Sequence, residues 1–276
     1  MANSTDLIDS RAAWLRLAAA LALSTVGGVG MWSVVVALPA IQAEFGVTRA
    51  AASFPYTLTM LGFGVGGIMM GRLSDRYGVR VPLVGATCAL ALGYIVASMS
   101  SSLLMYAIVQ GVLIGMLGSS ASFGPLLADI SHWFERRRGL AVAIVASGNY
   151  LAGAVWPPIV QYLIETVGWR SAHLCIGVIC LVTMLPLTYA MRRPSPHVAA
   201  ESAATAALRA PMPLGISPFA LQMLLMIAGV ACCVAMSMPQ VHIVAYCADL
   251  GYGPAVGAQM LSIMLAFGIV SRLASG

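Results

Sequence analysis

The sequence predicts an all-α membrane protein in which long apolar helices form a bundle. Of its 276 residues, 60% are hydrophobic and 8% are charged, whereas about 25% of the residues of soluble domains are charged. The apolar residues fall into charge-free segments of about 20 to 25 residues, the length that a helix needs to cross a hydrocarbon core of about 30 Å. So much apolar surface cannot be buried in a water-soluble core, so we expect lipid to be its solvent.

The first expected span covers residues 17–41 and follows a polar tail, residues 1–16. At 25 residues it is too long for the apolar core of a signal peptide, so we expect it to remain in the protein as a membrane helix. A second span is expected at residues 50–71, after a short loop that carries two charged residues. Both segments are long enough to cross the bilayer as helices.

Residues 81–128 form a stretch of 48 positions without a charge, which is about twice the length of one span. The polar run at residues 98–102 divides this stretch into a third and a fourth span. In the fourth span, Gly111, Gly115 and Ser119 lie four residues apart, and therefore on one helix face. This pattern is typical of close packing between membrane helices, and we expect it to serve packing rather than ligand binding.

Two more expected spans, residues 139–164 and 171–191, complete the first six. The segment that follows is rich in Ala, Pro and Ser and is expected to be a flexible linker. A seventh span is expected from residue 216 to about 246, and an eighth begins near residue 255. The sequence therefore predicts three parts, at residues 1–191, 192–215 and 216–276.

The positive charges predict the orientation of the chain. All 14 basic residues are arginine, and basic loops tend to stay in the cytoplasm. Only Arg49 and Arg170 fall on one side of the expected spans, against eleven on the other. We therefore expect a multi-pass protein of the inner (plasma) membrane with a cytoplasmic N-terminus, and we attribute the net charge of +5 to topology rather than to nucleic-acid binding. The eleven are Arg11, Arg16, Arg72, Arg76, Arg80, Arg136, Arg137, Arg138, Arg192, Arg193 and Arg209.

The polar stretch between the second and third spans has a specific order of residues. A basic loop that only set the orientation would need no such order. The stretch resembles the loop between helices 2 and 3 of the major facilitator superfamily, G-x-L-x-D-R-x-G-x-R. Every fixed position of that pattern is met, by Gly71, Leu73, Asp75, Arg76, Gly78 and Arg80. We expect Gly78 to form a tight turn, and Gly67 with Gly71 to allow a close helix contact.

Further segments are similar to the monocarboxylate and oxalate–formate branch of this superfamily. The drug–proton antiporter branch fits less well, because Ala107 stands where those proteins usually carry an arginine, and their glycine-rich helix-5 motif is absent. Gly268 stands where animal monocarboxylate carriers have an aspartate one turn before an arginine of helix 8, so the resemblance does not extend to proton coupling by such a pair. The similar segments are residues 133–141, 146–148, 157–158, 168–170, 241–246 and 249–252, and the pattern R-x-x-x-G at residues 272–276.

The resemblance implies a helical bundle of the major facilitator type, with a complete N-terminal six-helix half and about two helices of the C-terminal half. Members of this superfamily bind substrate near the bilayer midplane, between the two halves. The chain stops before a second cytoplasmic loop could repeat the motif. We therefore expect a truncated product, an incomplete sequence or a split half, for which the missing C-terminal half or a second copy would complete the site.

Arg272 is the strongest candidate for binding a substrate. It lies about 18 residues into the eighth span with no acidic residue nearby in the sequence. A charge deep in the membrane costs about 2.5–3.5 kcal/mol on insertion scales, so it normally faces a cavity or a partner. Its planar guanidinium can bind a carboxylate through two hydrogen bonds. The alternative is that Arg272 reaches the cytoplasmic interface at the helix end.

Four other polar residues in apolar spans are candidates for the same site. His242 could act as a proton-linked switch, or it could bond a backbone carbonyl at a helix interface. Gln240 in the seventh span, and Asn149 with Tyr150 in the fifth, could contact substrate or bond between helices.

Two groups of charges are expected to form a conformational latch on the cytoplasmic face rather than a binding site. One is Asp75 with Arg76. The other is Asp129 with the basic run at residues 136–138. A carboxylate can accept charge-assisted hydrogen bonds from a neighbouring guanidinium, which would hold two loops together.

We therefore predict a secondary active transporter that moves a small organic anion, in particular a monocarboxylate, by alternating access, with proton coupling left open. The alternatives are efflux of a drug or metabolite within the same superfamily, and a truncated membrane remnant that does not transport. No cluster of a nucleophile and a base points to an enzyme. The six cysteines show no metal-ligand spacing or disulfide framework, so we expect neither a metal nor another cofactor.

Overall fold

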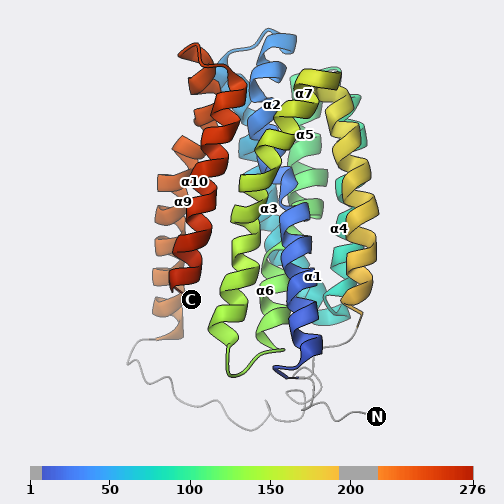
Figure 1. Cartoon of the computed structure of the whole chain (residues 1–276), viewed down its shortest axis with the longest axis vertical. Coiled ribbons are helices and arrows are strands. Elements are labelled where there is room, and N and C mark those ends of the chain that lie inside the picture. The colour runs from blue at the N-terminus through green and yellow to red at the C-terminus, as the bar shows by residue number, and fades with distance from the viewer. Residues whose placement is uncertain (1–7, 193–216, 276) are drawn as a thin grey trace.

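The computed structural model describes residues 8–192 and 217–275, which form helices joined by short turns, with no strand among these residues. Most of the expected linker lies outside this part of the chain. The predicted all-α bundle is confirmed (Figure 1). Its helical segments are α1 (Arg11–Gly27), α2 (Val29–Phe45), α3 (Arg49–Tyr77), α4 (Arg80–Ser98), α5 (Leu103–Val109), η2 (Gln110–Gly118), η3 (Ser119–Ser122), α6 (Gly124–Ser131), α7 (Arg138–Ala190), α9 (Pro218–Asp249) and α10 (Pro254–Ser275).

The first expected span is formed by α1 and α2, which meet at Gly28. The helix begins at Arg11, six residues before the predicted start, because the Ser10 hydroxyl caps it by accepting a hydrogen bond from the backbone N–H of Ala13 at 3.3 Å. Part of the predicted polar tail is therefore helical.

The segment α7 is 53 residues long and contains two helices, one for each of two expected spans, which meet at Gly168. A straight helix of that length would extend about 80 Å, far more than a bilayer is thick. Gly168 interrupts it with φ 79° and ψ 158°, a conformation that residues with a side chain rarely adopt. The chain reverses there (Figure 1), so the predicted turn between the fifth and sixth spans is confirmed.

The fourth span is irregular, and its glycines pack against α3. Its centre, η2, is a π-helix over Gln110–Gly118. A Cβ atom on Gly111 would stand 2.9 Å from Cβ of Leu58, and one on Gly115 would stand 2.6 Å from the carbonyl oxygen of Thr59. The predicted packing role of these two glycines is confirmed, since a side chain at either position would push α3 away.

On α3 itself, however, the predicted contact glycines are the wrong ones. A Cβ atom on Gly67 or Gly71 would have no described atom within 4 Å. Instead, a Cβ atom on Gly62 would collide with the carbonyl of Gly111, and one on Gly66 with the carbonyl of Met116. The close contact therefore lies about one turn earlier on α3 than predicted, on the face that meets η2.

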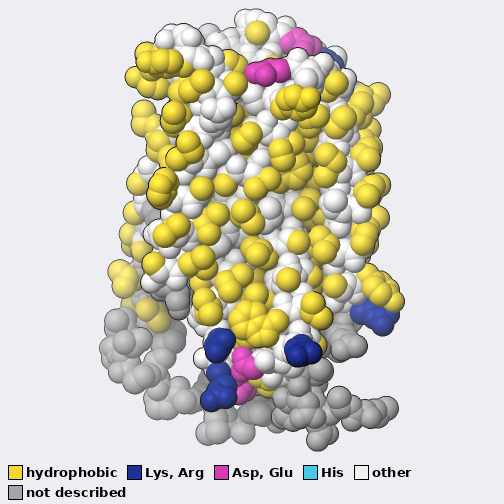
Figure 2. Space-filling view, in the orientation of Figure 1, with side chains coloured by type: hydrophobic (Ala, Val, Ile, Leu, Met, Phe, Trp, Pro, Cys, Tyr) yellow, Lys and Arg dark blue, Asp and Glu magenta, His cyan; other side chains and the backbone are white. Residues whose placement is uncertain are grey.

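Six helices are long and apolar enough to cross a membrane, within the residues that the structure describes. They include α1 with α2 as one unit, the whole of α7, and both α9 and α10. The helix α3 has 29 residues and is not among the six. Figure 2 shows one face of the bundle, where apolar side chains cover the middle and charged side chains gather at the two ends.

We name the two ends by their place in Figure 1. The lower end contains the start of α1, the α3–α4 turn, the α6–α7 loop and the end of α7. The upper end contains the α2–α3, α4–α5 and α9–α10 turns, together with the reversal at Gly168.

At the upper end, Arg170 joins three spans. Its guanidinium donates hydrogen bonds to the carbonyl oxygens of Ser98 and Ser100, at 2.9 and 2.8 Å, and to the carboxylate of Glu44 at 2.6 Å. The indole N–H of Trp169 donates to the other oxygen of Glu44. The end of α2, the α4–α5 turn and the second half of α7 are therefore held together by one arginine.

At the lower end, a buried ion pair joins α1 to α6. Nε and Nη2 of Arg16 each lie 2.7 Å from one carboxylate oxygen of Asp129. The two residues are 4% and 9% exposed. The predicted pairing of Asp129 with the basic run at residues 136–138 is wrong, because Asp129 points into the bundle toward α1 and not toward the following loop.

The last two helices pack onto the outside of the earlier ones. In Figure 1, α10 lies along the first half of α7, and α9 lies behind α10. A Cβ atom on Gly153 of α7 would collide with Leu265 of α10, and it would stand 2.7 Å from the Trp32 ring of α2. Gly153 therefore lets α10 approach the bundle closely.

Candidate functional site

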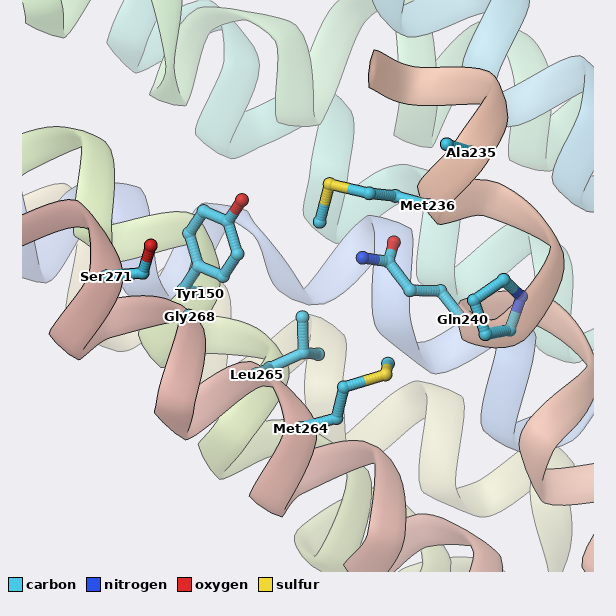
Figure 3. A pocket seen from close by; sticks show the side chains of 9 residues that line it. Tyr150, Ala235, Met236, Gln240, Met264, Leu265, Gly268 and Ser271 are labelled. Carbon is cyan, nitrogen blue, oxygen red and sulfur yellow. The ribbon is translucent and has the colours of Figure 1, made fainter. Parts of the chain in front are cut away.

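A cavity of about 350 Å³ lies where α9 and α10 meet the first half of α7. Its polar groups are the phenol of Tyr150, the amide of Gln240 and the hydroxyl of Ser271. Figure 3 shows that Met236 and Gln240 extend from α9 toward α10, and that the Tyr150 ring lies beside Gly268. The other lining residues are Ala235, Met236, Pro239, Met264, Leu265 and Gly268.

The local sequence explains the shape of this cavity. Pro239 lies inside α9 and has no backbone N–H to donate, so the carbonyl oxygen of Ala235, which also lines the cavity, lacks the usual helical hydrogen bond from residue 239. Gly268 has no side chain, and the Tyr150 ring occupies the space that a Cβ atom there would take. An aspartate at position 268 would collide with this ring. The glycine found there is therefore the residue that leaves space for Tyr150.

The structure brings together two of the five candidate residues identified from the sequence. Tyr150 and Gln240 line the cavity from α7 and α9. The sequence did not single out Ser271 or the two methionines, Met236 and Met264. Nothing in the sequence distinguishes these residues from other small or apolar residues of a membrane helix, so only the packing of the helices reveals them.

The other three candidates lie elsewhere or are not fully described. Asn149 is half-buried, and its side-chain oxygen would stand 3.5 Å from a Cβ atom on Gly28, so it faces the junction of α1 and α2. His242 is half-buried on α9 and is not among the lining residues. The backbone of Arg272 belongs to α10, one turn after Gly268, and its side chain lies outside the described part of the chain.

The predicted gate motif lies at the lower end, away from the cavity. Gly78 has φ 78° and ends α3, so the predicted tight turn is confirmed. Leu73 packs against the apolar core, whereas Asp75, Arg76 and Arg80 are exposed. The Arg76 guanidinium lies 5.3 Å from the centre of the Tyr77 ring.

Asp75 forms no ion pair with any residue of the described part of the chain. The predicted latch between Asp75 and Arg76 is therefore not closed here, and the carboxylate of Asp75 is presented to the surroundings at the end of α3.

A second polar cluster is buried between α5, η2 and α7. Nδ1 of His173 lies 2.8 Å from the carbonyl oxygen of Trp169, and Nε2 lies 3.1 Å from the Tyr106 hydroxyl. The amide of Gln110 donates to the same hydroxyl at 2.8 Å. With Nδ1 protonated, His173 donates to the Trp169 carbonyl and accepts from the Tyr106 hydroxyl, which in turn accepts from the Gln110 amide, so the cluster joins the fourth span to α7. None of its members lines the cavity.

The described residues contain no group of three or more His, Cys, Asp or Glu side chains that could hold a metal ion. The arrangement in the cavity is therefore one of hydrogen-bonding groups set in an apolar wall, which is typical of a small-molecule binding site.

Comparison with known proteins gives one family. A family model described as Major Facilitator Superfamily matches residues 20–276. The chain is 31% identical over 182 residues to monocarboxylate transporter 6 of Mus musculus, which covers 66% of this chain and 38% of that protein. It is 30% identical over 210 residues to monocarboxylate transporter 13 of Bos taurus, which covers 74% and 46%.

A fungal relative has a different described role. The chain is 34% identical over 131 residues to the Fujikurins efflux protein of Gibberella fujikuroi, which covers 45% of this chain and 28% of that protein. The chain spans less than half the length of each of these three relatives.

Proposed function

The chain belongs to the major facilitator superfamily, and from this premise we propose that it is part of a secondary transporter for a small organic anion of the monocarboxylate class. The family is a family of transporters, and two of the relatives are named as monocarboxylate transporters. Because the chain spans less than half of their length, the activity of the whole protein is an inference from the part described here.

The observation that carries this proposal is the position of the cavity. It lies between α7, which belongs to the first six expected spans, and α9 with α10, which follow the expected linker. Transporters of this type bind substrate between their two halves. Tyr150 and Gln240 come from opposite sides of that boundary, so a bound substrate would bridge it.

Arg272 would supply the charge that an anionic substrate needs. It lies 18 residues after Pro254, the first residue of α10, and one residue after Ser271, which lines the cavity. At 1.5 Å per residue this is about 27 Å along the helix. Arg272→Lys keeps the charge but loses the planar pair of donors, so we expect carboxylate binding to fall sharply with Arg272→Lys and to vanish with Arg272→Ala. Normal carboxylate binding by both variants would make Arg272 an interfacial anchor instead.

We further propose that the lower end faces the cytoplasm of the cell and that the protein lies in the plasma membrane. The excess of arginine at that end supports this orientation. In this orientation, residues 1–191 form one half of an alternating-access transporter, residues 192–215 form a cytoplasmic linker, and residues 216–276 begin the second half.

We assign the motif at residues 71–80 to the cytoplasmic gate of this transporter. The exposure of Asp75 supports this assignment, because a carboxylate held at the end of α3 is available to a donor from outside the described residues. Such a contact would act on the opening equilibrium and not on substrate affinity. We propose neither an enzymatic activity nor a cofactor for this chain.

Efflux of a less polar compound is the second candidate function. The apolar part of the cavity favours it, since Met236, Met264 and Leu265 supply flexible, polarizable walls. The described role of the Gibberella fujikuroi relative points the same way. The two candidates differ in whether the ligand must carry a negative charge.

Equilibrium binding to the purified chain separates the two candidates. Radiolabelled pyruvate is the probe, and its uncharged amide and an apolar aromatic amine are the competitors. We expect unlabelled monocarboxylates to displace the labelled pyruvate. The uncharged amide and the aromatic amine should not displace it. Gln240→Ala and Tyr150→Phe should weaken pyruvate binding, whereas the matched control Tyr162→Phe, at an exposed position of the same helix, should not. Competition by the amine alone would favour efflux.

A further inference from the structure

A bidentate ion pair joins the two parts of the bundle at the upper end. Nη1 of Arg49 lies 2.5 Å from Oδ2 of Asp249, and Nη2 lies 2.5 Å from Oδ1. Arg49 is the first residue of α3, and Asp249 is the last residue of α9. The pair therefore connects the first six expected spans to the helix that follows the linker.

An apolar cluster lies next to this pair. It is formed by Leu38 of α2, Ala52 of α3, and Val241 and Ala245 of α9. All four are buried, with exposed fractions between 1% and 6%. At this level α9 is therefore packed directly against α2 and α3.

Along α9, the cluster begins where the lining of one cavity ends and reaches the lining of a second. A cavity of about 340 Å³ at the upper end is lined by both members of the ion pair, and on α9 its lining begins at Ala245. The lining of the cavity that contains Tyr150 ends on α9 at Gln240. The two cavities share no lining residue, and the five-residue step between them on α9 is about 7.5 Å. Along this helix, Val241 of the apolar cluster lies between the two linings.

We propose that the Arg49–Asp249 pair and the four-residue apolar cluster form the gate that closes the upper end of the substrate pathway. Its role in transport rests on the function proposed above. The contact between α9 and the two earlier helices does not depend on which substrate is carried. In the arrangement described here this gate is closed. The pair breaks when α9 moves away from α2 and α3, and the two cavities then join.

The second ion pair of the upper end provides a matched comparison. Arg170 and Glu44 lie 2.6 Å apart, against 2.5 Å for Arg49 and Asp249, and their side chains are 39% and 40% exposed, against 36% and 51%. Water and salt therefore screen the two pairs to a similar degree. The pairs differ in the helices that they join. Arg170 and Glu44 both belong to the first six expected spans, whereas Arg49 is paired with a residue of α9.

A partly exposed pair is suited to a contact that must break in every cycle. Pairs of this kind shift an equilibrium by up to about fivefold, so removing one partner should raise the open fraction by about two- to fivefold. Separating a buried pair would leave uncompensated charge in an apolar interior, a cost that a partly exposed pair avoids.

The test measures how fast a thiol inside the cluster reacts. Ala52→Cys is made in a chain whose six native cysteines are replaced by serine or alanine, and the purified protein is held in lipid nanodiscs, where both ends meet the reagent. The rate of reaction with a polar maleimide is then compared between this parent, Asp249→Asn, the charge swap Arg49→Asp/Asp249→Arg, and Glu44→Gln. No carboxylate is present, so the result is independent of the proposed substrate.

We expect Asp249→Asn to raise the labelling rate by about two- to fivefold, the charge swap to return it toward the parent value, and Glu44→Gln to leave it unchanged. The gate assignment is overturned if Asp249→Asn reacts like the parent, or if Glu44→Gln raises the rate as much as Asp249→Asn. Monodisperse elution of each variant in gel filtration shows that a faster reaction does not come from unfolding. Failure of pyruvate binding, with this labelling pattern intact, would refute the proposed substrate and leave the gate standing.

Discussion

The two ends of the bundle use charge in different ways. Among the side chains that the structure describes, the lower end carries nine arginines and four acidic residues, whereas the upper end carries two arginines and three acidic residues. At the upper end each arginine forms an ion pair with an acid of another helix. At the lower end the basic residues are in excess, and the ion pair that stands out, Arg16–Asp129, is buried.

This difference separates two roles of arginine in one small chain. Excess positive charge at one end resists translocation and sets the orientation, and this role needs no specific partner. Paired arginines hold helices together, and their contribution depends on burial. The two roles can be tested separately, and the orientation of the chain should give an all-or-none result.

The comparison first requires that the arginine-rich end be cytoplasmic. A thiol introduced as Ser202→Cys, in the expected linker and in a background without native cysteines, should react with a membrane-impermeant maleimide only after the cells are permeabilised. Reaction in intact cells would reverse the orientation and remove the first role.

The buried pair should give the largest effect on stability. Asp129→Asn leaves the Arg16 guanidinium without its anionic partner at a site where both residues are less than 10% exposed. We expect the free energy of unfolding to fall by about 3–5 kcal/mol, measured by reversible unfolding of the detergent-purified chain. The double variant Arg16→Met/Asp129→Leu should lose less than Asp129→Asn alone, because no buried charge is left unpaired. Equal losses would show that the pair acts by packing alone.

The upper end should give intermediate effects that follow the number of hydrogen bonds. Arg170→Lys keeps the charge but cannot reach both carbonyls and the carboxylate of Glu44. We expect a loss of about 1–2 kcal/mol in the same unfolding measurement. Arg49→Lys should cost less than about 1 kcal/mol, because the side-chain hydrogen bonds described for Arg49 reach Asp249 alone. The reverse order would contradict the assignment of Arg170 as the residue that joins three spans.

The gate motif should give the smallest effect on stability. Asp75 is exposed and forms no ion pair within the described residues, so Asp75→Asn should change the free energy of unfolding by less than about 0.5 kcal/mol. A loss near that of Asp129→Asn would mean that Asp75 already has a strong contact in the folded chain.

Much of the helical architecture could be predicted from the sequence. Charge-free segments of the right length gave the helices, and the special conformations of Gly78 and Gly168 agree with the predicted turns. These features are local, since span length and glycine conformation depend on a few neighbouring residues. The start of α1 at Arg11 depends on the Ser10 cap, which the length of a charge-free segment does not reveal.

Contacts between distant segments could not be predicted in the same way. Asp129 pairs with Arg16 across 113 positions, although three arginines lie much closer in the sequence. The face of α3 that carries Gly62 and Gly66 is covered by η2, whereas the face with Gly67 and Gly71 is open in the described residues. Spacing shows which residues share a face, but the neighbour of that face depends on the whole bundle.

The cavity was predictable in part for the same reason. Polar residues in apolar spans stand out, so Tyr150 and Gln240 were identified. Asn149 stood out equally but faces Gly28, and Met236 and Ser271 gave no signal. A role in substrate binding remains a prediction for each of these residues.

The central claim is that the cavity between α7, α9 and α10 binds a small organic anion. Protection of a thiol by ligand tests it most directly. Ser271→Cys places a thiol in the cavity lining, and Met260→Cys places one at an exposed position of the same helix as a control. Both are made without the native cysteines, and maleimide labelling is timed with pyruvate or with its uncharged amide. The account predicts that pyruvate slows labelling at position 271 and not at position 260, and that the amide slows neither. Equal labelling at position 271 with and without pyruvate, or equal protection by the amide, would contradict it.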